Sequence, residues 1–176
     1  MYTHLAFRMR LFWYRTDREA WAFGLVIALI VVLFAFLLRG VYAYQDQRRY
    51  SALEVHRQNV HCLARNIYFE ARGEPVAGQY AVAEVTMNRQ ASWVFPRTVC
   101  GVVYQKSAFS WTDFRSLPAP QGDDWERALN IAEAVYYQRY APQVKGALFY
   151  HADYVQPDWA KEKKQVARIG KHLFYR

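Results

Sequence analysis

One carboxyl group in this sequence has surroundings suited to acid catalysis. Residues 66–75 read NIYFEARGEP, in which Glu70 follows two aromatic residues. Burial among aromatic rings disfavours the charged form of a carboxyl group and raises its pKa. A carboxyl group that keeps its proton near neutral pH can donate it to a departing glycosidic oxygen. The simpler alternative is that Glu70 only pairs with Arg65, Arg72 or a helix end.

Glycosidases that use two carboxyl groups hold them about 5–5.5 Å apart when retaining and about 6.5–9.5 Å apart when inverting. Here a second carboxyl group would come from one of four acidic residues: Glu74, Glu84, Asp113 and Asp153. None of them lies in a pattern comparable to that around Glu70. An ion pair with Arg72, or a place at the start of the next helix, also explains Glu74. We predict that Glu74 contacts the substrate and does not catalyse.

The spacing of apolar residues places Glu70 near the end of a helix. Apolar residues recur at intervals of three and four, as on one buried helix face: Val60, Leu63, Ala64, Ile67 and Tyr68. Gly73 and Pro75 are expected to end this helix. Glu70 is therefore predicted in its last turn.

The residues that follow this helix complete a pattern that predicts an α+β fold that is mainly α. We expect further helices over residues 76–89, 98–104 and 123–139, with Asp123 or Asp124 as the cap of the last one, and a strand over 146–151. Between the last two helices, residues 106–122 show no clear period. Ordered loops of this length in a compact domain are more often functional than not.

An uncharged segment near the N-terminus predicts a membrane span. Residues 20–38 read AWAFGLVIALIVVLFAFLL, 19 residues, and about 20 apolar residues of helix cross a hydrocarbon core. A buried helix of a soluble core usually keeps a polar stripe, which this segment lacks. A cleaved signal peptide, ending near Val41-Tyr42-Ala43, is the closer alternative, but its apolar core would be shorter, about 7–15 residues.

Charges around the span predict its orientation. Arginines precede it at positions 8, 10, 15 and 18, whereas Arg39 follows it directly and Arg48 and Arg49 follow after a gap. The positive-inside rule then places the N-terminus in the cytoplasm. We therefore predict a single-pass protein of the inner (cytoplasmic) membrane with its C-terminal domain periplasmic or otherwise extracytoplasmic. The expected parts are a cytoplasmic segment (1–19), the span in the lipid bilayer (20–38), a stalk (39–58) and the domain (59–176).

Composition restricts the function only loosely. Residues 41–176 carry 18 lysines and arginines against 13 aspartates and glutamates, a net charge of +5. Such scattered charge fits an anionic surface or an ordinary solvated surface, and no nucleic-acid-binding module is legible, so no nucleic-acid partner is predicted. Outside the cytoplasm, Cys62 and Cys100 could form a disulfide, with two separate buried thiols as the alternative.

Several separated motifs together resemble the SleB-type cell-wall hydrolases, also called spore-cortex-lytic enzymes. The matching strings, in order, are NIYFEARGEPVAGQYAVAEVTMNR, FPRTVCGVVYQ, AFSW and RIGKHLFYR. They extend from about residue 60 to residue 176. The ordered set is specific, whereas the ExRGE motif alone would be weak.

The resemblance implies a lysozyme-like fold and cleavage between N-acetylmuramic acid and N-acetylglucosamine in peptidoglycan glycan strands. It further implies a lytic transglycosylase, in which the muramic 6-hydroxyl replaces water and leaves a 1,6-anhydro end. The family's catalytic glutamate is the first of ExRGE, which is Glu70 here. No cofactor is implied, and protein partners are not predicted.

The resemblance also suggests residues that border the substrate groove. Phe109 and Trp111 could stack on sugars, and Ser110 could bond an acetamido group, although the two rings could instead anchor the loop. At the end of the predicted strand, Tyr150, His151 and Asp153 are expected to contact substrate or to position Glu70. His172 of the closing motif is expected to support the site from behind.

Two other functions fit parts of the sequence. A non-catalytic peptidoglycan-binding membrane protein could keep the fold without the activity, although the Glu70 motif is intact. A zinc-dependent amidase would need ligands such as His61, His151 and an acidic residue. The sequence lacks HExxH and other zinc-ligand spacing, so no metal site is predicted.

Overall fold

The computed structural model describes residues 18–176 and divides the chain into two compact units at Ala52 and Leu53. Most of the predicted cytoplasmic segment, including Arg8, Arg10 and Arg15, lies outside the described residues. The second unit contains Glu70 and every other predicted site residue.

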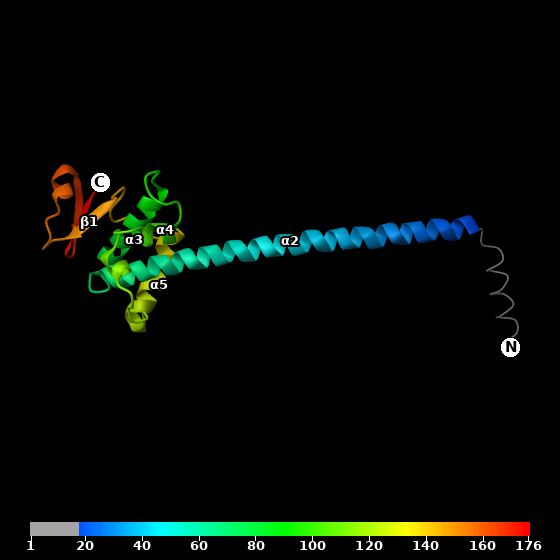
Figure 1. Cartoon of the computed structure of the whole chain (residues 1–176), viewed down its shortest axis with the longest axis horizontal. Helices are drawn as coiled ribbons and strands as arrows, with labels where there is room; N and C mark the ends of the chain where they lie inside the picture. Colours follow the sequence, from blue (N-terminus) through cyan, green and yellow to red (C-terminus); the bar gives the residue numbers. More distant parts are fainter. Residues whose placement is uncertain (1–17) are drawn as a thin grey trace. The chain divides into compact units, whose positions relative to one another are not determined.

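The first unit is formed by the N-terminal part of helix α2 (Arg18–Ala71), labelled in Figure 1. Its apolar side chains are exposed, for example Phe23 (72%) and Phe36 (76%). Among the described residues, α2 is the one helix whose length and composition would allow it to cross a membrane. The segment predicted as a stalk (39–58) is helical and lies within the bounds of α2.

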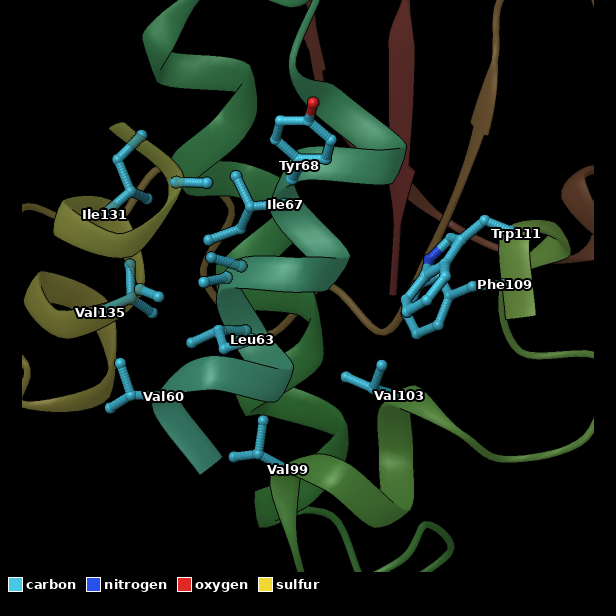
Figure 2. Close-up of a cluster of buried hydrophobic side chains, with 14 residues drawn as sticks. Val60, Leu63, Ile67, Tyr68, Val99, Val103, Phe109, Trp111, Ile131 and Val135 are labelled. Carbon is cyan, nitrogen blue, oxygen red and sulfur yellow. The ribbon is translucent and has the colours of Figure 1, made fainter. Parts of the chain in front are cut away.

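In the second unit, the last turns of α2 pack with α3 (Val76–Ala91), α4 (Val99–Val103) and α5 (Gly122–Tyr136). Figure 2 shows Leu63 and Ile67 facing Ile131 and Val135 of α5. The predicted helices are confirmed. The predicted cap of the last one is wrong, because Gln121 is the N-cap and both aspartates lie inside the first turn. There their carboxylates favour the helix through its dipole.

A three-stranded antiparallel sheet completes the fold, in the order β1 (Phe149–Ala152), β3 (His172–Tyr175), β2 (Gln165–Ile169). The predicted strand began three residues early, and β2 and β3 were not predicted. A two-residue turn joins them, with Gly170 at φ +58° as its first residue. Glycine adopts such a φ without strain.

The Glu74 carboxylate holds this turn against the α2–α3 junction. It accepts a hydrogen bond from the backbone N–H of Lys171 at 2.8 Å. A Cβ atom at position 170 would collide with the same carboxylate. The turn therefore requires glycine both for its backbone conformation and for the close approach of Glu74.

Buried polar groups fix the loop between α4 and α5 to α2. Within this loop, a 3-10 helix, η1 (Ser110–Asp113), contains Trp111, which is buried. The indole N–H of Trp111 donates to the Asn66 side chain at 3.0 Å, and Asn66 donates to the Thr86 hydroxyl at 3.1 Å. Asn66 precedes Glu70 by four residues, so one helix face carries both the loop anchor and the carboxyl group.

A disulfide joins Cys62 of α2 to Cys100 of α4, which confirms the predicted bridge. The sequence separation is 38 residues. Closing a loop of this length in the unfolded chain stabilises the fold by about 3–4 kcal/mol.

We therefore expect the double substitution of Cys62 and Cys100 by Ser to lower the thermal midpoint of the second unit's unfolding, measured by circular dichroism. Reduction of the wild-type protein should have a similar effect and no effect on the variant. Equal midpoints for the oxidised wild type and the variant would contradict this expectation.

Candidate active site

Glu70 lies in the last turn of α2 and points toward the sheet, where it meets Tyr150 of β1. The Tyr150 hydroxyl donates a hydrogen bond to the Glu70 carboxylate at 2.9 Å. Rings from β3 hold Tyr150 in place, with centroid distances of 5.1 Å to His172 and 5.7 Å to Phe174. Two elements far apart in sequence thus fix the position of the carboxyl group.

Arg89, in the last turn of α3, brings a positive charge to the same region. It is only 9% exposed, and its Nε donates to the backbone carbonyl of Leu148 at 2.7 Å. Its guanidinium carbon lies 5.3 Å from the Phe109 ring centroid and 5.5 Å from that of Phe95. The side chain is therefore held by a hydrogen bond and by cation–π contacts.

The environment raises the pKa of Glu70. Burial is the largest cause, and it is opposed by the hydrogen bond from Tyr150 and by the positive charge of Arg89. The pKa of Tyr150 is raised well above its usual value, mainly by burial and then by the negative charge of Glu70. Tyr150 therefore keeps its proton and donates, while Glu70 holds its own proton to a higher pH than an exposed glutamate.

A cavity of about 400 Å³ opens beside Glu70. Four predicted site residues line it with Glu70: Phe109, Ser110, Tyr150 and His151. Its rim includes Tyr154, which is 82% exposed. Glu70 is the single acidic residue among those lining this cavity in the described part of the chain.

A second cavity of about 340 Å³ adjoins the first and shares Arg89, Ala108 and Tyr150 with it. Aromatic side chains form much of its wall: Phe95, Phe149 and Trp159. The two cavities thus share a wall, to which Arg89 and Tyr150 both contribute.

Three predicted substrate contacts lie elsewhere, because each has a structural partner. Glu74 binds the backbone of the β2–β3 turn, and Trp111 is buried against Asn66. Asp153 forms an ion pair with Arg168 at 2.9 Å. None of the three is among the described residues that line the cavity beside Glu70, so their contact with substrate stays a prediction.

The other candidates for a second carboxyl group also do not line the cavity beside Glu70. Glu84 is buried and accepts hydrogen bonds from the backbone N–H groups of Gln143 and Val144, at 2.7 and 3.0 Å. Asp113 is exposed in η1 and does not line the cavity. The structure therefore brings none of the four candidates into the cavity wall.

The histidines occupy separate places. Nε2 of His151 lies 2.9 Å from the Tyr175 hydroxyl, beside the Glu70 cavity. His61 lines a different cavity, next to the disulfide. The two histidines considered as zinc ligands are thus not brought together. His172 packs its ring against Tyr150 and also lines the Glu70 cavity, so its bracing role stays a prediction.

Arg89 is the site residue that sequence reasoning missed. A signal was present, since Val82, Val85 and Arg89 follow one another at helical spacing on the buried face of α3. A charged residue in register with a buried face needs a reason, because burying an arginine is costly unless its donors are used. Here the reason is the neighbourhood of Glu70 and the two cavities.

Comparison with known proteins relates the second unit to cell-wall hydrolases. The sequence profile of the Cell Wall Hydrolase family matches residues 73–175. The spore cortex-lytic enzyme of Bacillus subtilis is 32% identical over 117 residues, which are 66% of this chain and 37% of the relative. That of Halalkalibacterium halodurans is 33% identical over 116 residues, 66% of this chain and 34% of the relative. The chain thus spans less than half the length of these curated relatives.

Two solved structures share the fold of the second unit. The catalytic domain of the Bacillus cereus SleB protein superposes with a TM-score of 0.57 at 30% identity, over 68% of this chain and 91% of that one. The catalytic domain of the germination-specific lytic transglycosylase SleB from Bacillus anthracis gives 0.57 at 32% identity, over 67% and 93%. The mainly α, α+β fold and the resemblance to SleB-type hydrolases are confirmed.

Proposed function

Because the chain belongs to the Cell Wall Hydrolase family, we propose that it cleaves peptidoglycan glycan strands, with Glu70 as the general acid and base. One observation carries this proposal: Glu70 is partly buried, accepts a hydrogen bond from Tyr150 and lines the cavity as its single acidic residue among those described. Its raised pKa favours the protonated form that an acid needs.

In the proposed first step, Glu70 gives its proton to the oxygen that links C1 of N-acetylmuramic acid to N-acetylglucosamine. The C1–O bond breaks, and the N-acetylglucosamine end leaves as an alcohol. The 6-hydroxyl of the same muramic acid then attacks C1, and its proton passes to the Glu70 carboxylate. A 1,6-anhydro end forms, and Glu70 is protonated again for the next cycle.

The single carboxyl group supports this lytic transglycosylase route over two-carboxylate hydrolysis. A hydrolase of the usual kind needs a second carboxyl group within about 10 Å to activate water or to attack C1. None of the four acidic candidates lines the cavity beside Glu70, and three of them have partners within the fold. An intramolecular hydroxyl needs no second carboxyl group, because it is already held next to C1.

Mass spectrometry of purified peptidoglycan digested by the detergent-solubilised full chain tests the proposal. We expect fragments with 1,6-anhydromuramic ends. Reducing muramic ends would keep glycan cleavage but replace the transglycosylase route by hydrolysis. Intact strands with freed peptide stems would instead indicate an amidase and contradict the proposal.

We further propose that residues 20–38 anchor the chain in the inner membrane, with the second unit outside the cytoplasm. The exposed apolar side chains of this part of α2 support a lipid environment, since apolar surface of that extent is unfavourable in water. A peptidoglycan substrate also requires an extracytoplasmic site.

A reporter enzyme that works only outside the cytoplasm, fused after Arg176, tests this topology. It is expected to be active and to sediment with membranes. Activity of a cytoplasmic reporter at the same position would refute the orientation. A soluble exported product would indicate cleavage after the apolar segment.

Tyr154 on the cavity rim is expected to stack on a sugar ring of the bound strand. Tyr154→Ala should then raise KM for strand cleavage by about tenfold, since stacking of an aromatic ring contributes roughly 0.5–1.5 kcal/mol beyond the area that it buries. Trp93 is the matched control, because it is equally exposed (82%) and lies outside both cavities. Equal effects of Tyr154→Ala and Trp93→Ala would argue against a specific contact.

A further inference from the structure

The guanidinium group of Arg89 lies at the boundary between the two cavities and has hydrogen-bond donors that no side chain or carbonyl group of the described residues uses. Its Nε is used by the Leu148 carbonyl, while its two terminal amino groups have no hydrogen-bond partner among the described residues. Arg89 lines both cavities. It forms no direct ion pair with Glu70, since the ion pairs of the described residues do not include either side chain.

The two terminal amino groups are not among the buried unpartnered side-chain atoms of the described residues, so they are open to the cavities that Arg89 lines. Arg89 is nine-tenths buried and held rigidly by the rings of Phe95 and Phe109. The planar guanidinium group matches a carboxylate, which can accept two parallel hydrogen bonds from it. A ligand carboxylate at this boundary would therefore use both terminal amino groups.

The second cavity adds further positive charge and no negative charge. Lys106 lines it, and Nζ of Lys163 lies 4.1 Å from the ring centroid of Phe149 in its wall. No acidic side chain is among the described residues that line it. Cations beside aromatic walls fit a sugar that carries an acid group, because the rings contact the sugar and the cations neutralise the acid.

We propose that the second cavity, with Arg89 and Lys106, binds a carboxylate carried by a muramyl residue of the glycan strand. This inference rests on the proposed function, since it assigns a second binding site to the same substrate. The carboxylate has two sources, namely the lactyl group of a muramyl residue without its peptide, or the peptide stem. In either case the site makes binding depend on an acid group that N-acetylglucosamine lacks.

Binding measured in the detergent-solubilised full chain carrying Glu70→Gln tests this proposal without turnover. The probes are oligomers of equal length that alternate N-acetylglucosamine with muramic acid. One probe has free lactyl carboxylates, a second has them converted to neutral methylamides, and a third carries peptide stems. An oligomer of N-acetylglucosamine alone is the fourth probe.

We expect at least one acidic probe to bind about tenfold more tightly than the methylamide probe, the difference expected for a charge-assisted pair. Tightest binding of the stem-free probe assigns the site to the lactyl carboxylate, and tightest binding of the third probe assigns it to the stem. Arg89→Gln should abolish the preference, and Lys106→Gln should reduce it by about threefold. Lys145→Gln, an exposed lysine outside both cavities, should leave it unchanged.

Lys106 is exposed, so its variant remains informative if Arg89→Gln fails to fold. Equal affinity for the acidic and methylamide probes would overturn the inference while leaving the proposed function in place. A preference that survives both Arg89→Gln and Lys106→Gln would overturn it as well. Failure of every probe to bind would contradict the proposed function together with the inference.

Discussion

Glu70→Gln is expected to reduce strand cleavage to near background while leaving strand binding largely intact. Gln has the size of Glu and can still accept the hydrogen bond from Tyr150, but it has no acidic proton to give. Positioned acid–base catalysis contributes about 10²–10⁴-fold to a rate, and more when the leaving oxygen cannot depart unprotonated. The measurement is the initial rate of soluble muropeptide release from purified peptidoglycan, together with the amount of protein that sediments with it.

Stability separates this chemical loss from unfolding. The pKa of Glu70 is raised in the folded protein, so its contribution to stability is present in full below its unfolded pKa and is lost as pH rises through the folded value. At neutral pH a neutral Gln avoids the cost of a buried charge, and the thermal midpoint should not fall. Glu74→Gln is the control. Its cleavage rate should fall less and in proportion to its loss of stability, because Glu74 holds the β2–β3 turn.

A Glu70→Gln variant that kept more than about a tenth of the wild-type rate would contradict the assignment of Glu70 as the principal acid. That rate corresponds to a barrier increase of less than about 1.4 kcal/mol, too small for the loss of the principal acid. The role would then have to pass to another group.

Tyr150→Phe is expected to lower the rate by about ten- to a hundredfold and to move the alkaline limb of the pH profile to higher pH. The rate falls because the hydroxyl that positions Glu70 is lost, and small misplacements of a catalytic group are costly. The limb moves because Tyr150 stabilises the charged carboxylate and so lowers its pKa. Without that hydrogen bond, Glu70 keeps its proton, and hence its acid function, to a higher pH.

The measurement is kcat/KM for strand cleavage across pH, which reports the pKa of the free enzyme's acid. Tyr175→Phe is the matched control, because it removes the Tyr175 hydroxyl that contacts His151 and leaves the contact between Tyr150 and Glu70 in place. Its alkaline limb should stay where it is. A Tyr150→Phe limb that stayed fixed or moved to lower pH would show that Tyr150 does not set the pKa of Glu70.

The sequence by itself determined the helices and marked Glu70 as the candidate acid. The three-and-four spacing around Leu63 and Ile67 predicts the end of α2 and places Glu70 in its last turn, as observed. The apolar segment at residues 20–38 likewise predicts a long apolar helix, and the two cysteines indicate a possible disulfide. These features depend on residues close together in the chain, or on residue types whose chemistry leaves few alternatives.

Only the tertiary structure decided which distant side chains meet Glu70. The Tyr150 hydroxyl reaches it across 80 positions of sequence, and Arg89 comes from another helix. The tertiary structure also gives Glu74, Trp111 and Asp153 partners within the fold. Their local sequence is equally compatible with residues of a substrate groove. The physical reason is that helical and strand periodicity fixes which face of an element is buried, while the packing of α2, α3 and the sheet fixes which buried faces touch.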